Sequence, residues 1–285
     1  MKRNHFRYFE RLRVRWVEVD MQQVVFNGLY LMYFDAAAAG YWRAMAMPYQ
    51  DTMARLGGDL YVRKASVEYG GSARYDDVLD IGLRCERIGN SSIVFRAAAF
   101  RGEAALVTGE LVYVFANPAT QTPVPVPPPL REVLQSFEAG AAMLTVRLGS
   151  WAELGPEAKP LRKAAFVDEQ KAPAVLEADG DDAGAVHAVA HNRFGQALAT
   201  GRLTEPSAGV GKVGRMAVLH GVRGAGVGRA VLDALCGAAR ERGLHEILLH
   251  AQRSAVPFYA RAGFSARGPA FEEAGIEHLE MARAP

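Results

Sequence analysis

Hydrophobic and polar residues alternate in several stretches of the first half of the chain. In residues 11–16, Leu12, Val14 and Trp16 alternate with three arginines, the period-two pattern of a half-buried β-strand. We interpret these arginines as the solvated face of the strand, and a phosphate-binding patch is the weaker alternative. Four more strand-like runs follow, separated by glycine-containing turns. They cover residues 62–69, 78–86, 92–100 and 106–115.

A different pattern separates the first strand from the others, because residues 29–47 are apolar nearly all round. A helix without a polar face has to be enclosed by other elements. Asn27 stands directly before it and is predicted to be its N-cap; a hairpin turn at Asn27 and Gly28 is disfavoured, since no alternation follows. One enclosed helix and about five strands predict an antiparallel sheet wrapped around the helix.

A proline-rich stretch, residues 117–129, divides the chain. Its six prolines cannot donate to a sheet or continue a helix, so a strand ending near Phe115 must stop there. A short helix is predicted at residues 130–137. We place the boundary after residue 140, which predicts one domain at 1–140 and a second at 141–285.

The second half alternates helices and strands and predicts a mixed α/β domain. The helix at residues 226–242 carries its apolar positions on one face, and Gly243 fits its C-terminal cap. The other predicted elements are helices at 161–170 and from Ala255 onwards, and strands at 185–191, 196–202, 213–219 and 246–251. The fold class predicted for the whole chain is therefore α+β.

Composition narrows the function classes. With 33 lysines and arginines against 31 aspartates and glutamates, the charge balance argues against nucleic acid as the main partner. No apolar signal segment follows the basic N-terminus, and no charge-free run reaches the roughly 18 residues that span a bilayer. Cys85 and Cys236 lie far apart within apolar patterns, which favours core thiols in a reducing compartment over a metal pair. We expect a soluble, cytoplasmic protein with no metal and no membrane partner.

Asp20 lies at the junction between the first strand and the apolar helix. Taken alone, it is best interpreted as a loop carboxylate that accepts hydrogen bonds from nearby N–H groups. The N-terminus of the helix, however, offers free N–H donors and a positive dipole end to a developing oxyanion. Asp20, seven residues before Asn27, could face that helix end.

The stretch that starts at Asp20, D-x-x-x-V-V-F-N-x-x-Y-L-x-Y-F-D, resembles the signature of the 4-hydroxybenzoyl-CoA thioesterase family of hot-dog acyl-CoA thioesterases. The resemblance covers about residues 8–138. It implies a sheet wrapped around the long helix and acyl-CoA bound between the subunits of a homodimer or homotetramer. It also implies that Asp20 is the catalytic nucleophile or the base for water, and that backbone N–H groups near Asn27 and Gly28 polarise the thioester carbonyl.

Residues 216–229, M-A-V-L-H-G-V-R-G-A-G-V-G-R, read as a strand, a glycine-rich turn and the start of a helix. This arrangement exposes successive N–H groups to a phosphate. The Rossmann fingerprint would need glycine at Arg229, and Gly211–Lys212 lacks the remaining residues of a Walker loop.

The segment R-G-A-G-V-G resembles the pyrophosphate loop of the GCN5-related N-acetyltransferases (GNAT), and A-Q-R-S-A-V-P-F-Y-A-R-A-G-F resembles a later helix of that superfamily. The resemblance covers about residues 145–285 and includes E-A-D-G-D-D at 177–182 and the tail F-E-E-A-G-I-E-H-L-E-M. It implies that Tyr259 protonates the leaving thiolate, although a purely structural aromatic residue is nearly as well supported. The implied coenzyme A contacts are Met216 and Val218 to pantetheine through the backbone, Arg223, Gly224, Gly226, Gly228 and Arg229 to the pyrophosphate, and Gln252 near the cofactor.

Other signals are weak. His245 and His250 have the wrong spacing for a zinc helix, and no G-x-S-x-G motif occurs. Glu272, Glu273 and His278 either line the acceptor pocket or face solvent, and solvent exposure is favoured.

Together these observations predict a bifunctional enzyme: an acyl-CoA thioesterase followed by an N-acetyltransferase that uses acetyl-CoA and an unknown amine acceptor. The alternative is that one half is a non-catalytic acyl-CoA-sensing or dimerisation module that regulates the other.

Overall fold

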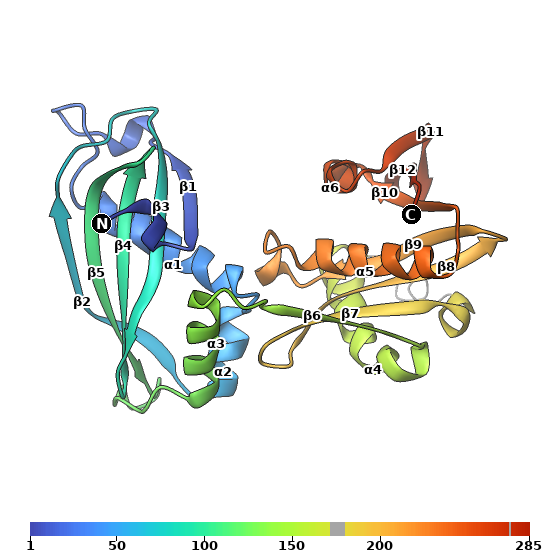
Figure 1. The fold of residues 1–285 in the computed structure, drawn as a ribbon, viewed down its shortest axis with the longest axis horizontal. Helices are drawn as coiled ribbons and strands as arrows, with labels where there is room; N and C mark the ends of the chain where they lie inside the picture. Colours follow the sequence, from blue (N-terminus) through green and yellow to red (C-terminus); the bar gives the residue numbers. More distant parts are fainter. Residues whose placement is uncertain (172–179, 274) are drawn as a thin grey trace. The chain divides into compact units, whose positions relative to one another are not determined.

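The computed structural model describes residues 1–171, 180–273 and 275–285. It divides into two compact units, Met1–Met143 and Leu144–Pro285 (Figure 1). Residues 177–179, the first three of the E-A-D-G-D-D motif noted in the sequence, lie outside the described residues, and so does Ala274. Among the described residues, no helix is both long and apolar enough to cross a membrane.

The N-terminal unit is built on a five-stranded sheet in the order β1-β3-β4-β5-β2, and every neighbouring pair is antiparallel. The strands are β1 (Tyr8–Arg13), β2 (Asp59–Tyr69), β3 (Val78–Ile88), β4 (Ser92–Arg101) and β5 (Ala104–Ala116). All five were predicted. The first lies three residues nearer the N-terminus than expected: it ends at Arg13, and Trp16 lies in a 3₁₀ turn with 73% of its surface exposed. The arginines of this segment pair with carboxylates, Arg11 with Asp80 and Arg15 with Glu18.

The long helix α1 (Leu29–Ala44) lies against this sheet, as predicted, and buries Phe34, Ala37 and Tyr41. Gly109 of β5 allows the close approach, because a Cβ there would lie 2.5 Å from the Phe34 ring. The prediction of a fully enclosed helix is wrong for the single chain. The other face of α1, which includes Leu31 and Met32, is exposed.

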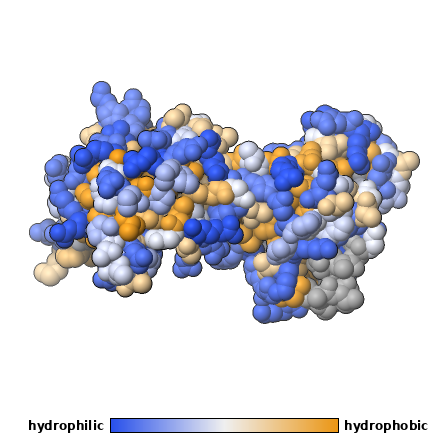
Figure 2. Space-filling model, turned by 90° about the horizontal axis from the view of Figure 1, so that it is seen from below, coloured by the Kyte–Doolittle hydropathy of each residue, from blue (hydrophilic) through white to orange (hydrophobic). Residues whose placement is uncertain are grey.

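The remaining helices of this unit are α2 (Tyr49–Leu56), which was not predicted, and α3 (Pro128–Glu138), which was. Apolar residues reach the surface of this unit among polar ones (Figure 2). The large ones are Met1, Trp16, Val17, Met21, Phe26, Leu31, Met32, Tyr61, Val62, Tyr69, Tyr75 and Val78. Leu148 is the single large exposed hydrophobic residue found in the described part of the C-terminal unit.

The C-terminal unit contains a seven-stranded sheet in the order β11-β12-β10-β9-β8-β7-β6. Its strands are β6 (Leu144–Gly149), β7 (Val186–Asn192), β8 (Ala197–Ser207), β9 (Val210–Val218), β10 (Glu246–Gln252), β11 (Ser265–Glu273) and β12 (Ile276–Arg283). Neighbouring strands are antiparallel except β9 and β10, which are parallel. Four of these strands were predicted; β6, β11 and β12 were not.

Two helices cover opposite faces of this sheet, α4 (Trp151–Arg162) and α5 (Val227–Glu241) (Figure 1). Leu154 and Ala158 of α4 pack on Val189 of β7, whereas Val231 and Leu235 of α5 pack over Gly201 of β8. The predicted helix from Leu161 was placed too late. A capping box at Ser150 starts α4, and the helix contains Pro156 and Pro160, although proline is rare inside helices. It continues as a π-helical segment at Lys163–Glu169. The last helix is α6 (Val256–Arg261), as predicted.

Candidate functional site

The parallel strands β9 and β10 separate after three paired positions. Their ladder ends at Lys212 on β9 and Leu248 on β10, but the strands continue to Val218 and Gln252. Beyond the last pair, β9 keeps its partner β8 on one side and has no neighbouring strand on the other within the described residues. Backbone groups left in this way need a partner, and an extended ligand can take the place of the missing strand.

A backbone irregularity lies in the separated part of β9. Arg215 has a positive φ of 52°, which is uncommon for a residue with a side chain. The β8–β9 register shifts around it, between the pairs Arg202–Gly214 and Thr200–Ala217. The shift redirects the backbone next to Met216, one of the residues implied to contact pantetheine. Strained positions of this kind cluster at binding sites.

The glycine-rich turn follows β9, as predicted. Gly224 (φ 86°) and Gly226 (φ 78°) adopt the left-handed conformation that glycine reaches without steric cost. Helix α5 then begins at Val227 with Gly226 as its N-cap and without a capping side chain. The first N–H groups of the helix therefore have no side-chain acceptor from the cap and can bind an anion.

The glycine-rich turn, the separated strands and α6 surround a cavity of about 730 Å³. All eight residues that the sequence suggested for coenzyme A line it: Met216, Val218, Arg223, Gly224, Gly226, Gly228, Arg229 and Gln252. The structure thus brings together residues from two strands, a turn and a helix that the sequence placed on separate elements.

Both arginines suggested for the pyrophosphate already hold carboxylates. Arg223 makes a two-pronged contact with Glu169, at 2.6 and 2.7 Å, and Arg229 contacts both oxygens of Asp233 at 2.8 and 2.9 Å. The hydrogen bonds from Arg223 hold the pKa of Glu169 below its usual value. A phosphate that binds Arg223 directly must therefore displace Glu169, the last residue of the π-helical segment that follows α4.

Tyr259 on α6 also lines the cavity and is largely buried, at 8% exposed. Burial raises the pKa of its hydroxyl to about 12. The group is therefore protonated at neutral pH and can act as a proton donor. Gln252, which lines the same cavity, exchanges amide hydrogen bonds with Gln170 at 3.1 and 3.4 Å.

Sequence reasoning missed most of the cavity wall away from the glycine-rich turn. Lys212 of β9 and Glu273 of β11 both contact Nδ1 of His250, at 3.4 and 2.9 Å. His278 of β12 is buried and stacks on Phe271. The favoured interpretation of His278 as solvent-facing is therefore wrong, whereas it is confirmed for Glu272 and Glu273, which are exposed. Both His278 and Glu273 nevertheless line the cavity. The paired strands β11 and β12, which were not predicted, bring them there.

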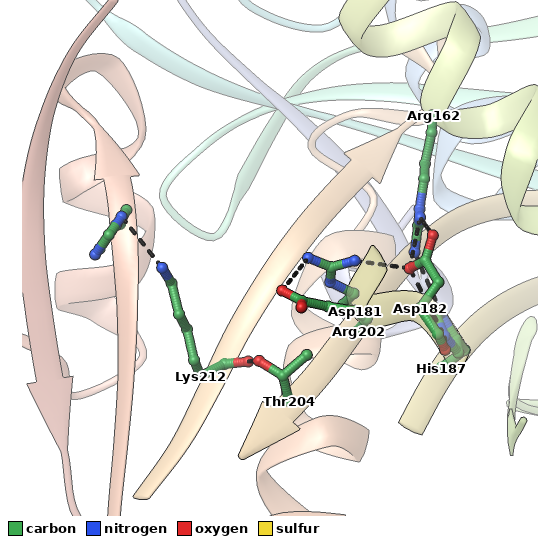
Figure 3. Close-up of polar contacts among 8 residues, drawn as sticks. Arg162, Asp181, Asp182, His187, Arg202, Thr204 and Lys212 are labelled. Carbon is green, nitrogen blue, oxygen red and sulfur yellow. Dashed lines mark hydrogen bonds and ion pairs between the residues drawn. The ribbon is translucent and has the colours of Figure 1, made fainter. Parts of the chain in front are cut away.

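A buried network of charges lies next to this wall (Figure 3). Asp182 accepts hydrogen bonds from Arg162 at 2.9 and 3.0 Å and from Arg202 at 2.8 Å. Arg162 also contacts the ring of His187 at 3.3 Å. Burial lowers the pKa of His187 from its ordinary value, and the nearby Arg162 adds to the effect. Arg202 and the neighbouring Asp181 both line the cavity, so this network fixes part of its wall.

In the N-terminal unit, Asp20 closes a tight loop. Its Oδ1 accepts a hydrogen bond from the N–H of Gln22 at 2.8 Å, and its own N–H donates to Val24 O at 2.9 Å. A cavity of about 240 Å³ in this unit lies beside Cys85 and Glu138, and Asp20 does not line it. The geometry of the single chain is that of a loop carboxylate bonded to local N–H groups.

The predicted N-cap at Asn27 is wrong. Gly28 occupies the cap position and no side chain caps the helix; Asn27 instead accepts a hydrogen bond from Tyr69 through its carbonyl. The sequence interpretation also missed Glu18, a carboxylate only 5% exposed. Glu18 binds Arg15 and accepts a hydrogen bond from Tyr33 of α1 at 2.8 Å, and these contacts hold its pKa low despite the opposing effect of burial.

Comparison with known protein families assigns both units. Residues 152–284 match the family described as "Acetyltransferase (GNAT) domain", and residues 22–108 match the "Thioesterase superfamily". An uncharacterized N-acetyltransferase of Bacillus subtilis (YjcF) is 37% identical over 122 residues, which is 42% of this chain and 86% of the relative. The chain joins a hot-dog thioesterase-superfamily domain to a GNAT acetyltransferase domain.

Further relatives match one domain each. A putative esterase of Aquifex aeolicus is 28% identical over 99 residues, 35% of this chain and 77% of the relative. A crystal structure of an acyl-CoA N-acyltransferase from Pseudomonas aeruginosa is 33% identical, covers 50% of this chain and 99% of its own, and has a TM-score of 0.45.

The two domains differ in how far a single chain assembles the suggested residues. In the GNAT domain, Tyr259 and all eight residues suggested for coenzyme A line one cavity. In the thioesterase domain, Asp20 lies two residues before the matched segment, which begins at residue 22, and Asn27 and Gly28 lie inside that segment. Both families use acyl-CoA substrates. Within the described residues, no three His, Cys, Asp or Glu side chains are grouped so that they could hold a metal ion.

Proposed function

We propose that the chain is a bifunctional enzyme of coenzyme A thioesters: the thioesterase domain hydrolyses an acyl-CoA, and the GNAT domain transfers an acetyl group from acetyl-CoA to an amine. The observation that supports transfer most directly is the cavity of about 730 Å³ between the separated strands β9 and β10, which ends at the glycine-rich turn. The cavity combines an anion-binding site at the glycine-rich turn with the backbone groups of the separated part of β9.

In this proposal the N–H groups of the glycine-rich turn bind the pyrophosphate, together with Arg223 and Arg229. Pantetheine lies along the separated part of β9 and bonds the backbone of Met216 and Val218. Tyr259, protonated at neutral pH, gives a proton to the thiolate that leaves when the new amide forms.

For the thioesterase domain we propose Asp20 as the nucleophile or as the base for water, and backbone N–H groups near Asn27 and Gly28 as the donors to the thioester oxygen. The site would be completed by a second copy of the chain in a homodimer or homotetramer. The exposed apolar residues of this domain, among them Leu31 and Met32 of α1, support such a partner.

Release of free thiol by the purified protein tests both activities. A panel of acyl-CoA esters without amine reports hydrolysis, and acetyl-CoA with a panel of primary amines reports transfer. Tyr259→Phe should slow transfer by about 10²-fold and leave hydrolysis unchanged, since the lost proton donor belongs to one domain. Tyr75→Phe, an exposed ring in the other domain, is the control. Equal activities in wild type and Tyr259→Phe would contradict the role of Tyr259.

A second function is favoured by one observation. Because Asp20 is bonded within its own loop and lines neither of the two cavities described, the N-terminal domain could instead be a non-catalytic module that senses acyl-CoA or dimerises. An acyl-CoA that binds without being hydrolysed and changes the rate of acetyl transfer would support this alternative.

A further inference from the structure

His250 occupies a distinctive position in the GNAT cavity. It lies on β10 two residues beyond Leu248, the last residue paired with β9. Leu249 and Ala251 of β10 are buried in the core, so His250 and Gln252 share the opposite face of the strand, and both line the cavity. The imidazole is therefore at the point where the two strands begin to separate.

The direction of the bound thioester follows from the proposed function, on which this inference rests. The phosphates bind at the glycine-rich turn, beyond the C-terminal end of β9 at Val218. Pantetheine placed along β9 then runs back towards Lys212, the other end of the separated segment. The acetyl group is consequently carried towards the wall that contains Lys212 and His250.

The hydrogen bonds of His250 determine which of its ring nitrogens carries the N–H and which keeps a lone pair that can accept a proton. Nδ1 lies 2.9 Å from Glu273 Oε2 and 3.4 Å from Lys212 Nζ. A neutral imidazole carries one N–H, and the shorter contact assigns it to Nδ1, which donates to the Glu273 carboxylate. Nε2 then keeps its lone pair. Its neighbour Glu280 Oε2 lies 3.9 Å away, beyond hydrogen-bond distance.

We propose that His250 is the general base of acetyl transfer and that Glu273 is the residue that positions it. A primary amine is protonated at neutral pH and cannot attack a carbonyl until it loses a proton. Nε2 of His250 takes that proton from R–NH₃⁺, and the nitrogen lone pair attacks the acetyl carbon. The C–N bond forms, the C–S bond breaks, and the sulfur receives the Tyr259 proton. The second amine proton restores the Tyr259 hydroxyl, and the proton held by His250 passes to solvent.

The charges around the imidazole make this proposal testable by pH. Lys212 approaches from β9, Glu273 from β11 and Glu280 from β12, while the Phe271 ring packs edge-on at 4.8 Å. Burial opposes the ionisation of Glu273, but the hydrogen bond from His250 lowers the pKa of its carboxyl, and the attraction between the two groups acts on both. Removing the Glu273 charge should therefore make the imidazole easier to deprotonate, without removing the base.

The kinetic test uses acetyl-CoA and a panel of primary amines: amino acids, aminosugars, polyamines and peptides with a free N-terminus. His250→Gln should lower kcat by about 10²–10⁴-fold with little change in KM for acetyl-CoA, and the acidic limb of the pH–rate profile should disappear. Glu273→Gln should keep the acidic limb of the pH–rate profile but move it to lower pH. His245→Gln, which changes an exposed histidine before the same strand, should behave as wild type.

Proton NMR of the full chain tests the pair without an acceptor amine. The chain has seven histidines, and the imidazole signal missing from His250→Gln identifies His250. In Glu273→Gln its titration midpoint should fall. Circular dichroism checks folding; if His250→Gln does not fold, the pH–rate profile of Glu273→Gln decides.

The outcomes distinguish a failure of the role proposed for His250 from a failure of the proposed transferase function. If wild type acetylates none of the amines, the proposed transferase function is overturned and the inference with it. If wild type transfers acetyl and His250→Gln keeps both the rate and the acidic limb, the role of His250 is overturned and the transferase function stands. An unchanged limb in Glu273→Gln overturns the positioning role of Glu273.

Discussion

The two domains differ in how much apolar surface they expose and in whether they enclose a large cavity. In the described residues, the thioesterase domain exposes twelve of the thirteen large hydrophobic side chains found at the surface, whereas the GNAT domain holds the cavity of about 730 Å³. The GNAT domain encloses its suggested residues within one chain. The thioesterase domain leaves Asp20 outside any cavity described and one face of its central helix uncovered. Folding of one chain is thus enough to assemble the cavity of the GNAT domain, whereas the thioesterase domain keeps a surface that a partner can cover.

The largest expected effect separates the two chemistries. Asp20→Asn preserves the shape of the side chain but removes the anion that attacks or activates water, so acyl-CoA hydrolysis should fall by about 10²–10⁴-fold. Acetyl transfer should stay within twofold or so, because no residue of the GNAT cavity is changed. Steady-state rates of both reactions measure this, with Asp51→Asn, an exposed carboxylate on α2, as the control. Unchanged hydrolysis in Asp20→Asn would remove Asp20 from the mechanism.

Substitution of a buried charged residue in the GNAT domain should destabilise that domain and leave the thioesterase domain unchanged. Asp182→Asn leaves Arg162 and Arg202 without the carboxylate between them, and breaking a buried ion pair in this way costs about 3–5 kcal/mol. Hydrogen-exchange mass spectrometry should show lower protection throughout the GNAT domain and none of this loss in the thioesterase domain. Asp181→Asn is the control, since that side chain is 69% exposed. Equal losses in both domains would show that they do not unfold separately.

A charge on the uncovered face of α1 tests whether the thioesterase domain needs a partner. Met32→Glu should prevent a second copy from covering this face, so light scattering should report a smaller particle and hydrolysis should fall with it. Transfer should persist. Ala54→Glu, at an exposed position on α2, is the matched control and should leave the mass unchanged. A wild-type chain that is already monomeric and hydrolyses acyl-CoA would contradict the need for a partner.

The smallest effect concerns the phosphate site. Arg223→Gln should weaken acetyl-CoA binding about tenfold, because a charge-assisted hydrogen bond is worth about 1.5–3 kcal/mol and part of this is already spent on Glu169. Glu169→Gln should do the reverse and tighten binding, since Arg223 is released from its carboxylate. Isothermal titration calorimetry measures both. Weaker binding in Glu169→Gln would mean that Glu169 supports the site instead of competing for it.

Local patterns in the sequence determined much of this protein. The alternating runs predicted the strands of the thioesterase domain, because a half-buried strand must alternate. The glycines at 224 and 226 predicted the turn, because few other residues adopt its positive φ. All eight residues suggested for coenzyme A lie on short segments of this kind, and all eight line one cavity.

Only the tertiary structure decided the features that depend on distant residues. The length of the β9–β10 ladder depends on where the two strands diverge, and no residue in either strand predicts that point. Lys212, His250 and Glu273 meet because three strands converge, while Asp182 joins Arg162 and Arg202 from separate elements. The uncovered face of α1 is equally invisible in the sequence. An apolar helix has to be buried, but composition does not say whether its own chain or a partner covers it.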